Sequence, residues 1–541
     1  MHIDKKIITD YLPQILLFSI FLIIGIISYK DFGISIDEEY HRQSGQLYYF
    51  FLKDLLIGSE LADKITVKDI QEASKQTLYL MPAFFDVIAE FFIDIFEIKD
   101  SQGIFFTRHL MNFIFFYISC FFFYYVILEI FNNKIYSIIG VLYLFFYPRI
   151  FGESFYNNKD MVFLSCSIIL IFFSLKFLKK QNYLTAFLFG IFSSLAFDIR
   201  VMALLQIATV YFIFFLKTLD SSTFIKEKYK YIFISLITTI FFIYIFWPYL
   251  WIDPLNNLIN FFSVIKDVTP DIQNFFMGDY YYSKTVPWHY YLTWILTTIP
   301  FFTILFGAIS LIILLRNIFK VVLNSDNKNQ KFWSNNKEMY NYYLIITFIV
   351  VLFTQIKFGV SYDGWRHLYF LYPFIIIFFI DGLHYLITKL KSKKIINILY
   401  FLVISEIIFL IFWNYKNHPY QFVFFNPVFK NLSYNNFELD YWGLSNRSSL
   451  EFISNNDTRD KIKVATISYS SLESSLLILN EFNRNKIVII HDLKNADFVI
   501  DNYRKKWDKA INLSELQNNF KKVLDITSGG RVINTVYKRI D

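Results

Sequence analysis

The chain has 541 residues, of which 55% are hydrophobic, 21% are aromatic and 18% are charged. Soluble domains carry about 25% charged residues, so this composition excludes a soluble enzyme, and the apolar content also excludes a disordered chain. The two cysteines, Cys120 and Cys166, lie in apolar runs, which rules out a disulfide framework or a CxxC metal site. The net charge of +7 raises the question of nucleic acid, and the answer depends on where the basic residues lie.

Apolar runs near the ~20 residues needed to cross a bilayer recur along the chain. They predict an α-helical polytopic membrane protein with about eleven transmembrane helices. The first run has no Ala-x-Ala-like exit and is read as a retained anchor, not as a cleaved signal. The predicted spans are 12–29, 104–130, 136–151, 161–178, 183–197, 201–216, 231–250, 289–315, 340–353, 368–388 and 395–413.

The lysines and arginines between the spans indicate the orientation. If the amino terminus is cytoplasmic, the basic turns all fall on the cytoplasmic side, as the positive-inside rule requires. The net charge is then explained by anionic lipid, without nucleic acid. We therefore expect an integral membrane protein with a cytoplasmic amino terminus. The turns contain Lys134, Lys176, Lys179, Lys180, Lys217, Lys226, Lys228, Lys230, Arg316, Lys320, Lys328, Lys331, Lys337, Lys389, Lys391, Lys393 and Lys394.

Three regions on the opposite side are too long to be simple turns, namely 30–103, 251–288 and everything after Asn414. The first contains 45–57 and 78–96, where acidic residues at helical spacing interrupt apolar ones, as in helices that lie on the membrane surface. A membrane-crossing helix over 78–96 is the alternative, but it would invert every later loop and spoil the lysine asymmetry. We predict a transmembrane domain over 1–413, with a first outer loop over 30–103, and an extracytoplasmic domain over 414–541.

The tail is polar and rich in asparagine. Strand-like runs are predicted at 463–467, 486–491, 497–500 and 531–538, and helical periodicity at 472–482 and 510–524. The tail is therefore predicted to be a small α/β domain.

The segment SIDEEYHRQSG follows the first span and places three adjacent carboxylates, Asp37, Glu38 and Glu39, just outside the membrane. Acidic residues at a helix exit are often only solvated surface. A second acidic group, Glu153 and Asp160, follows the third span on the same side. Two carboxylate clusters thus face one compartment.

Cationic groups occur on that face as well. Edge charges of this kind are expensive and persist mainly where they pair or bind a substrate. Asp198 with Arg200, or Asp363 with Arg366, could form purely structural pairs. The mixture of cations and carboxylates is also what binding a phosphate and activating a hydroxyl requires. The cations are Arg149, Lys159, Arg200, Lys284, His289, Arg366 and His367.

Two further readings were weighed for this face. The tryptophans and tyrosines at the edges of 251–288 are typical of an aromatic belt at the interface, with direct sugar stacking as the alternative. A zinc site on His289 and His367 would require convergence across a helix pair. No cofactor is required by the sequence, and a divalent metal stays an open question.

Several strings in order resemble the bacterial polytopic glycosyltransferases of family 39, in the GT-C superfamily, which are similar to protein O-mannosyltransferases and lipid A aminoarabinose transferases. The strings are SIDEEYH, PRIFGESFYNNKDMVF, WPYLW, PWHYYLTWILTTIP, YDGWRHLYFLYP and FELDYWGLSNRSSLEF. The resemblance covers the chain from Asp37 to about Phe452.

The resemblance implies a protein of the bacterial inner membrane. It implies transfer of a monosaccharide from a polyprenyl-phosphate donor to an acceptor hydroxyl at the non-cytoplasmic face of that membrane, with inversion of the anomeric centre. It implies that Asp37 is the general base, with Glu38 beside it, and that Asp160 is the second acidic residue. We carry Lys159, His289, Arg366 and His367 over to the donor phosphate region, where Arg200 also belongs by its position. The acceptor could be protein, lipid or glycan. The alternatives are a transporter or flippase of lipid-linked sugars and a sugar-polymer ligase.

Overall fold

The computed structural model describes residues 5–58, 81–220, 222–251, 253–267, 272–323, 332–430, 436–504, 516 and 518–540. Within these residues, nine helical segments are long and apolar enough to cross a membrane. Apart from the helix Phe301–Leu323, they agree with the predicted spans, and together the nine described segments make the chain an integral membrane protein. They are α1 (Lys5–Ser28), α6 (Ser101–Phe131), α9 (Asp160–Lys179), α11 (Ala203–Asp220), α12 (Ser222–Phe246), α15 (Phe301–Leu323), α16 (Asn336–Phe358), η2 with α17 (Arg366–Leu371 and Tyr372–Lys389) and α18 (Lys393–Lys416).

Three predicted spans differ in form from a single long helix. The span at 136–151 is a pair, α7 (Lys134–Phe146) and α8 (Pro148–Tyr156), bent by 61° where Pro148 starts a new helix. The span at 183–197 is the shorter α10 (Tyr183–Ile199). The span at 289–315 is wrong as one helix, because the chain breaks at Pro300 into α14 (Tyr290–Thr298) and α15; proline cannot donate the helical hydrogen bond.

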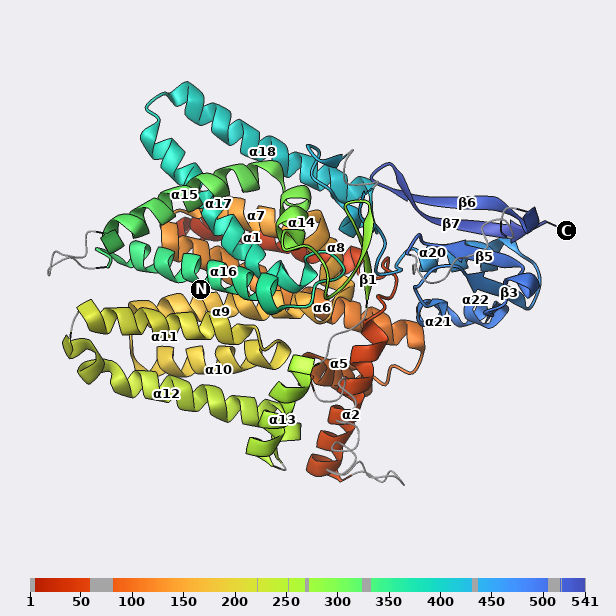
Figure 1. The fold of residues 1–541 in the computed structure, drawn as a ribbon, viewed down its shortest axis with the longest axis horizontal. Coiled ribbons are helices and arrows are strands. Elements are labelled where there is room, and N and C mark those ends of the chain that lie inside the picture. The colour runs from red at the N-terminus through yellow and green to blue at the C-terminus, as the bar shows by residue number, and fades with distance from the viewer. Residues whose placement is uncertain are drawn as a thin grey trace.

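The long helices run side by side in one bundle (Figure 1). The pairs α6 and α9, α10 and α12, and α15 and α17 are in extensive contact, and one large core cluster joins them. Apolar side chains also cover the outside: Ile27 on α1, Ile240 on α12 and Phe401 on α18 are each about two-thirds exposed. An outer surface of this kind fits lipid as the solvent.

Two outer helices, α2 (Glu38–Ile57) and α5 (Phe84–Ile95), pack against each other beside the bundle (Figure 1). They correspond to the helices predicted at 45–57 and 78–96; residues 78–80 lie outside the described residues. Close approach of the two requires Gly45, since a Cβ there would lie 2.5 Å from the Cβ of Asp86. The second outer region holds η1 (Pro248–Trp251), α13 (Pro254–Asp267) and a hairpin of β1 (Gln273–Phe276) and β2 (Asp279–Tyr282).

The tail forms a small domain beyond one end of the bundle (Figure 1). Its five-stranded sheet has the order β4-β3-β5-β7-β6, in which β4, β3 and β5 are parallel and β7 and β6 are antiparallel. The elements are α20 (Asn446–Asn456), β3 (Ile462–Thr466), α21 (Leu472–Leu476), α22 (Glu481–Lys486), β4 (Ile487–Ile489), η4 (Leu493–Asn495), β5 (Phe498–Asp501), β6 (Phe520–Ser528) and β7 (Arg531–Arg539).

One prediction for the tail is wrong. The predicted helix over 510–524 overlaps β6 from Phe520 onward, because those residues pair with β7 as an edge strand; residues 510–515 and 517 lie outside the described residues. The four predicted strands are confirmed as β3, β4, β5 and β7. The division at Asn414 stays a prediction. Phe422, within η3 (Gln421–Val423), and Trp442 both pack in the large core, whereas a separate core of the tail begins at Leu450.

Candidate active site

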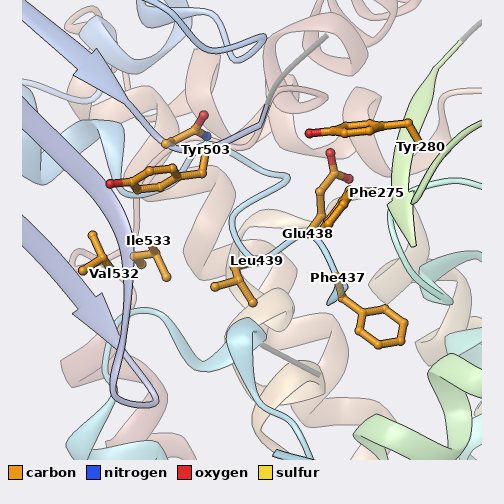
Figure 2. A pocket seen from close by; sticks show the side chains of 9 residues that line it. Phe275, Tyr280, Phe437, Glu438, Leu439, Tyr503, Val532 and Ile533 are labelled. Carbon is orange, nitrogen blue, oxygen red and sulfur yellow. The ribbon is translucent and has the colours of Figure 1, made fainter. Parts of the chain in front are cut away.

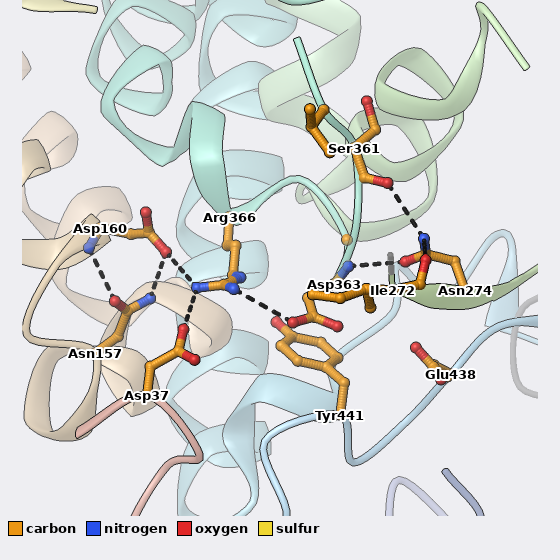
Figure 3. Close-up of polar contacts among 12 residues, drawn as sticks. Asp37, Asn157, Asp160, Ile272, Asn274, Ser361, Asp363, Arg366, Glu438 and Tyr441 are labelled. Atoms are coloured by element: carbon orange, nitrogen blue, oxygen red, sulfur yellow. Dashed lines mark hydrogen bonds and ion pairs between the residues drawn. The ribbon is translucent and has the colours of Figure 1, made fainter. Parts of the chain in front are cut away.

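The guanidinium of Arg366 is the centre of a charged network (Figure 3). Its Nη1 donates to Asp37 Oδ2 at 2.9 Å and to Asp160 Oδ2 at 3.1 Å, and its Nη2 donates to Asp363 Oδ2 at 3.3 Å. Asp37 and Arg366 are 329 positions apart in sequence. The two acidic clusters predicted to face one compartment therefore meet on one arginine.

Two aromatic rings fix the plane of this arginine. The guanidinium carbon of Arg366 lies 4.6 Å from the ring centre of Trp442 and 5.0 Å from that of Tyr362. Cation–π contacts are strongest where water is excluded, and the Arg366 side chain is only 4% exposed. The local backbone is also unusual, because Asp363 has φ 54° and Gly364 has φ 76°. Left-handed backbone before η2 is typical of a constrained functional loop.

The two carboxylates on Nη1 differ in access. The side chain of Asp37 is 34% exposed, whereas that of Asp160 is 1% exposed. Asp37 is the N-cap residue of α2, at the mouth of the first outer loop. Asp160 begins α9, where Asn157 Nδ2 donates to its Oδ2 at 3.1 Å and Asn157 Oδ1 accepts from its backbone N at 2.9 Å. Asp37 is therefore accessible from outside the protein, whereas Asp160 is enclosed by Arg366 and Arg200.

Three predicted cations lie around Asp160. Arg200, at the end of α10, forms an ion pair with Asp160 Oδ1. Among the described residues, Arg200 Nε and His367 Nδ1 are buried without a hydrogen-bond partner. Lys159 directly precedes Asp160, and burial, with a further contribution from nearby Arg200, lowers its pKa to about 8. Buried hydrogen-bond donors normally have partners. The cationic groups around Asp160 that lack one can therefore bind an anion.

Two predicted site residues lie elsewhere. Glu38 is buried, accepts from Ser35 N at 2.8 Å and lies 3.0 Å from His109 Nε2. It therefore holds the turn that carries Asp37. His289 precedes α14, where its Nδ1 is 3.2 Å from Thr293 Oγ1 and its ring packs on Phe276. No described contact joins it to Arg366 or Asp160, and its role at the donor phosphate stays a prediction.

Of the two structural ion pairs that the sequence allows, one forms and the other does not. Asp363 does pair with Arg366, as described above. Asp198 does not pair with Arg200: both of its carboxylate oxygens are buried without a hydrogen-bond partner among the described residues. The pairing of Arg366 is also not merely local, because it extends to Asp37 and Asp160 on other elements.

The sequence analysis missed the contribution of the tail. Arg504, just after β5, donates to Asp363 Oδ1 at 2.7 Å and to the backbone oxygen of Tyr441, and its Nε is 3.9 Å from Glu438 Oε1. Glu438 lies in the string FELDYWG, which marked the region without assigning it a role. Arg504 carries no local signal at all.

In the described parts of the chain, no three His, Cys, Asp or Glu side chains form a group that could hold a metal ion.

Comparison with known proteins gives matches in structure but not in sequence. No sequence profile of a protein family matches the chain, and no curated protein matches it. ArnT from Cupriavidus metallidurans, in the apo state and bound to undecaprenyl phosphate, is similar at 9% and 10% identity, each with a TM-score of 0.45, covering 97% of this chain and 98% of that chain. The archaeal oligosaccharyltransferase AglB from Archaeoglobus fulgidus is similar at 10% identity and a TM-score of 0.47, covering 92% of this chain and 70% of that chain.

The resemblance to glycosyltransferases of the GT-C superfamily stays a prediction from the sequence. The fold class, a polytopic helical bundle with a small sheet domain at its carboxyl end, is as predicted. At these identities and TM-scores the likeness carries no evidence about the reaction. The function is therefore argued from the site.

Proposed function

We propose that the protein is an inverting glycosyltransferase, which moves a monosaccharide from a polyprenyl-phosphate donor to an acceptor hydroxyl at the extracytoplasmic face of the membrane. The observation that carries the proposal is the bridge from Asp37 through Arg366 to Asp160. This bridge holds a carboxylate that is one-third exposed next to the buried Arg366 and, through Asp160, close to Arg200. A general base and an anion site, both needed for glycosyl transfer, thus lie side by side.

Asp37 is the general base of this proposal. Its Oδ2 is held by Arg366, while Oδ1 has no hydrogen bond or ion pair among the described residues, so we assign it to the acceptor hydroxyl. As the acceptor oxygen forms its bond to the anomeric carbon, its proton passes to Asp37. A positioned base of this kind contributes roughly 10²–10⁴-fold to the rate.

Lys159 and Arg200 receive the leaving group. The bond between the anomeric carbon and the phosphate oxygen breaks, and its electron pair leaves with the polyprenyl phosphate, which gains negative charge. Arg200 ends α10 and Lys159 precedes α9, so both lie at the level where the headgroup of a membrane lipid is found. Fixed cations aimed at developing charge stabilise the transition state. Attack by the acceptor oxygen on the face of the sugar that points away from the phosphate inverts the anomeric centre.

The test is a reconstituted reaction. Purified protein is mixed with polyprenyl-phosphate monosaccharides and envelope acceptors, and the products are analysed by mass and anomeric configuration. We expect a new glycosidic bond of inverted configuration and one free polyprenyl phosphate for each bond formed. Movement of the glycolipid across vesicles without a new bond would instead identify a flippase, and consumption only of lipid-diphosphate oligosaccharides would identify a polymer ligase.

A further inference from the structure

A cavity of about 290 Å³ lies between the outer hairpin and the tail domain (Figure 2). On one side, residues 436–438 extend the hairpin, since Glu438 N donates to Phe275 O at 3.3 Å and Phe276 bridges to Phe437. On the other side lie the loop after β5 and the start of β7. The cavity is lined by Phe275, Tyr280, Phe437, Glu438, Leu439, Asn502, Tyr503, Val532 and Ile533.

The lining suits a neutral, hydroxyl-rich ligand. Phe275, Tyr280 and Tyr503 provide aromatic rings, while Glu438 and Asn502 provide hydrogen-bonding groups. Flat apolar surfaces beside a few polar groups are typical of small-molecule sites, which range over about 300–1,000 Å³. The nine described residues that line it include no lysine, arginine or histidine. Among these described residues, an anionic lipid phosphate therefore has no counter-charge.

The cavity is joined to the candidate active site by consecutive polar contacts. Glu438 is 3.9 Å from Arg504, Arg504 donates to Asp363 at 2.7 Å, and Asp363 accepts from Arg366 at 3.3 Å. Figure 3 shows Asp160 on one side of Arg366 and Glu438 on the other. Because Arg200 pairs with Asp160, the donor cations and the cavity lie on opposite sides of Arg366.

Two features of the cavity indicate a built site. Tyr503 has φ 61°, a backbone region that a bulky residue adopts only where its surroundings hold it there. Burial and nearby Asp363 raise the pKa of Glu438 to about 8, although Arg504 acts in the opposite direction. At neutral pH its carboxyl therefore keeps a proton and can donate to a hydroxyl oxygen.

We infer that this cavity binds a sugar unit of the acceptor, so that the acceptor is a glycan whose reacting hydroxyl extends toward Asp37. The inference rests on the proposed function and adds the acceptor class to it. Rings stack on the apolar faces of pyranoses, and Glu438 fixes one hydroxyl. Arg504, which contacts both Glu438 and Asp363, is a positioning residue between the bound acceptor and the site.

The test separates acceptor binding from donor chemistry. The variants are Tyr280→Ala, Tyr280→Phe and Glu438→Ala, with Phe482→Ala, an exposed aromatic on α22 of the same domain, as the matched control. Transfer to oligosaccharides released from the envelope glycans is measured against their concentration. Release of polyprenyl phosphate with water as acceptor is measured in parallel, and it also reports that each variant is folded.

We expect Y280A and E438A to raise the half-saturating oligosaccharide concentration at least tenfold, with the reaction with water unchanged. Y280F, which keeps the ring, and F482A should behave as wild type. The inference is overturned if oligosaccharide transfer is unaffected in Y280A and E438A, if transfer and the reaction with water fall together, or if hydroxyl-bearing peptides are used in place of glycans. A wild-type protein that releases no polyprenyl phosphate at all would instead contradict the proposed function.

Discussion

Two aspartates on the same nitrogen of Arg366 show how the surroundings of a residue decide its role. Asp160 is buried between two arginines and an asparagine amide, so it can only organise charge. Asp37 shares the same Nη1 but keeps a third of its side chain exposed. The sequence pointed to both residues, and it predicted that Asp37 and Arg366 face the same compartment. The sequence could not show which of the two carboxylates is accessible to a substrate, because that accessibility depends on how the outer loop folds back.

Lys159 makes the proposed donor site dependent on pH. Its pKa of about 8 means that the ammonium loses its proton as the pH rises through 8, so the site loses a positive charge. We expect the KM for the polyprenyl-phosphate donor to rise about tenfold per pH unit above that value. Lys159→Arg keeps its charge because arginine stays protonated. The KM of this variant for the polyprenyl-phosphate donor should therefore not change with pH up to pH 9.5.

The control for this titration is Lys284→Met, which removes an exposed cation of another outer turn. Steady-state kinetics between pH 6.5 and 9.5 provide the measurement. Parallel loss of donor affinity in wild type and Lys159→Arg would show that another group is responsible.

At the scale of elements, the position of α2 decides where Asp37 lies. A buried ion pair fixes the outer helices to the bundle: Arg108 on α6 pairs with Asp86 on α5 and lies 3.4 Å from Glu90. Arg108 is 1% exposed. The outer loop is therefore anchored from within the membrane domain.

Arg108→Met should destabilise the protein by about 3–5 kcal/mol, because it leaves the buried carboxylate of Asp86 without its arginine, while Glu90 keeps Arg42. The matched control is Lys53→Met, which removes the more exposed pair between α2 and Asp94 on α5 and should cost about 1 kcal/mol or less. Thermal unfolding in detergent measures both. Equal shifts in the two variants would contradict the anchoring role of Arg108.

Elements were predictable where the signal is local. The spans follow from hydropathy, because every membrane helix satisfies its own backbone. The helix predicted at 510–524 failed because β6 depends on its pairing with β7, and an edge strand has only a weak pattern of its own. The break at Pro300 was visible in the sequence, yet the continuous apolar run around it favoured a single span.

At the scale of the whole molecule, the site is assembled from both the membrane bundle and the tail. Arg504 pairs with Asp363 across 141 positions of sequence, and no periodicity or motif predicts such a contact. The resemblance covered the chain only to about Phe452 and therefore stopped before Arg504. The tail closes the charged network and forms one wall of the cavity, which gives it a direct part in the proposed reaction.

The central claim is that Asp37 takes the proton of the acceptor beside a separate lipid-phosphate site. Asp37→Asn, reconstituted in nanodiscs, tests it when single-turnover transfer and the Kd for polyprenyl phosphate are measured on the same preparation. We predict a transfer rate lowered roughly 10²–10⁴-fold and a Kd within about twofold of wild type, because Lys159 and Arg200 are intact. Full turnover by a correctly folded Asp37→Asn protein would contradict the claim.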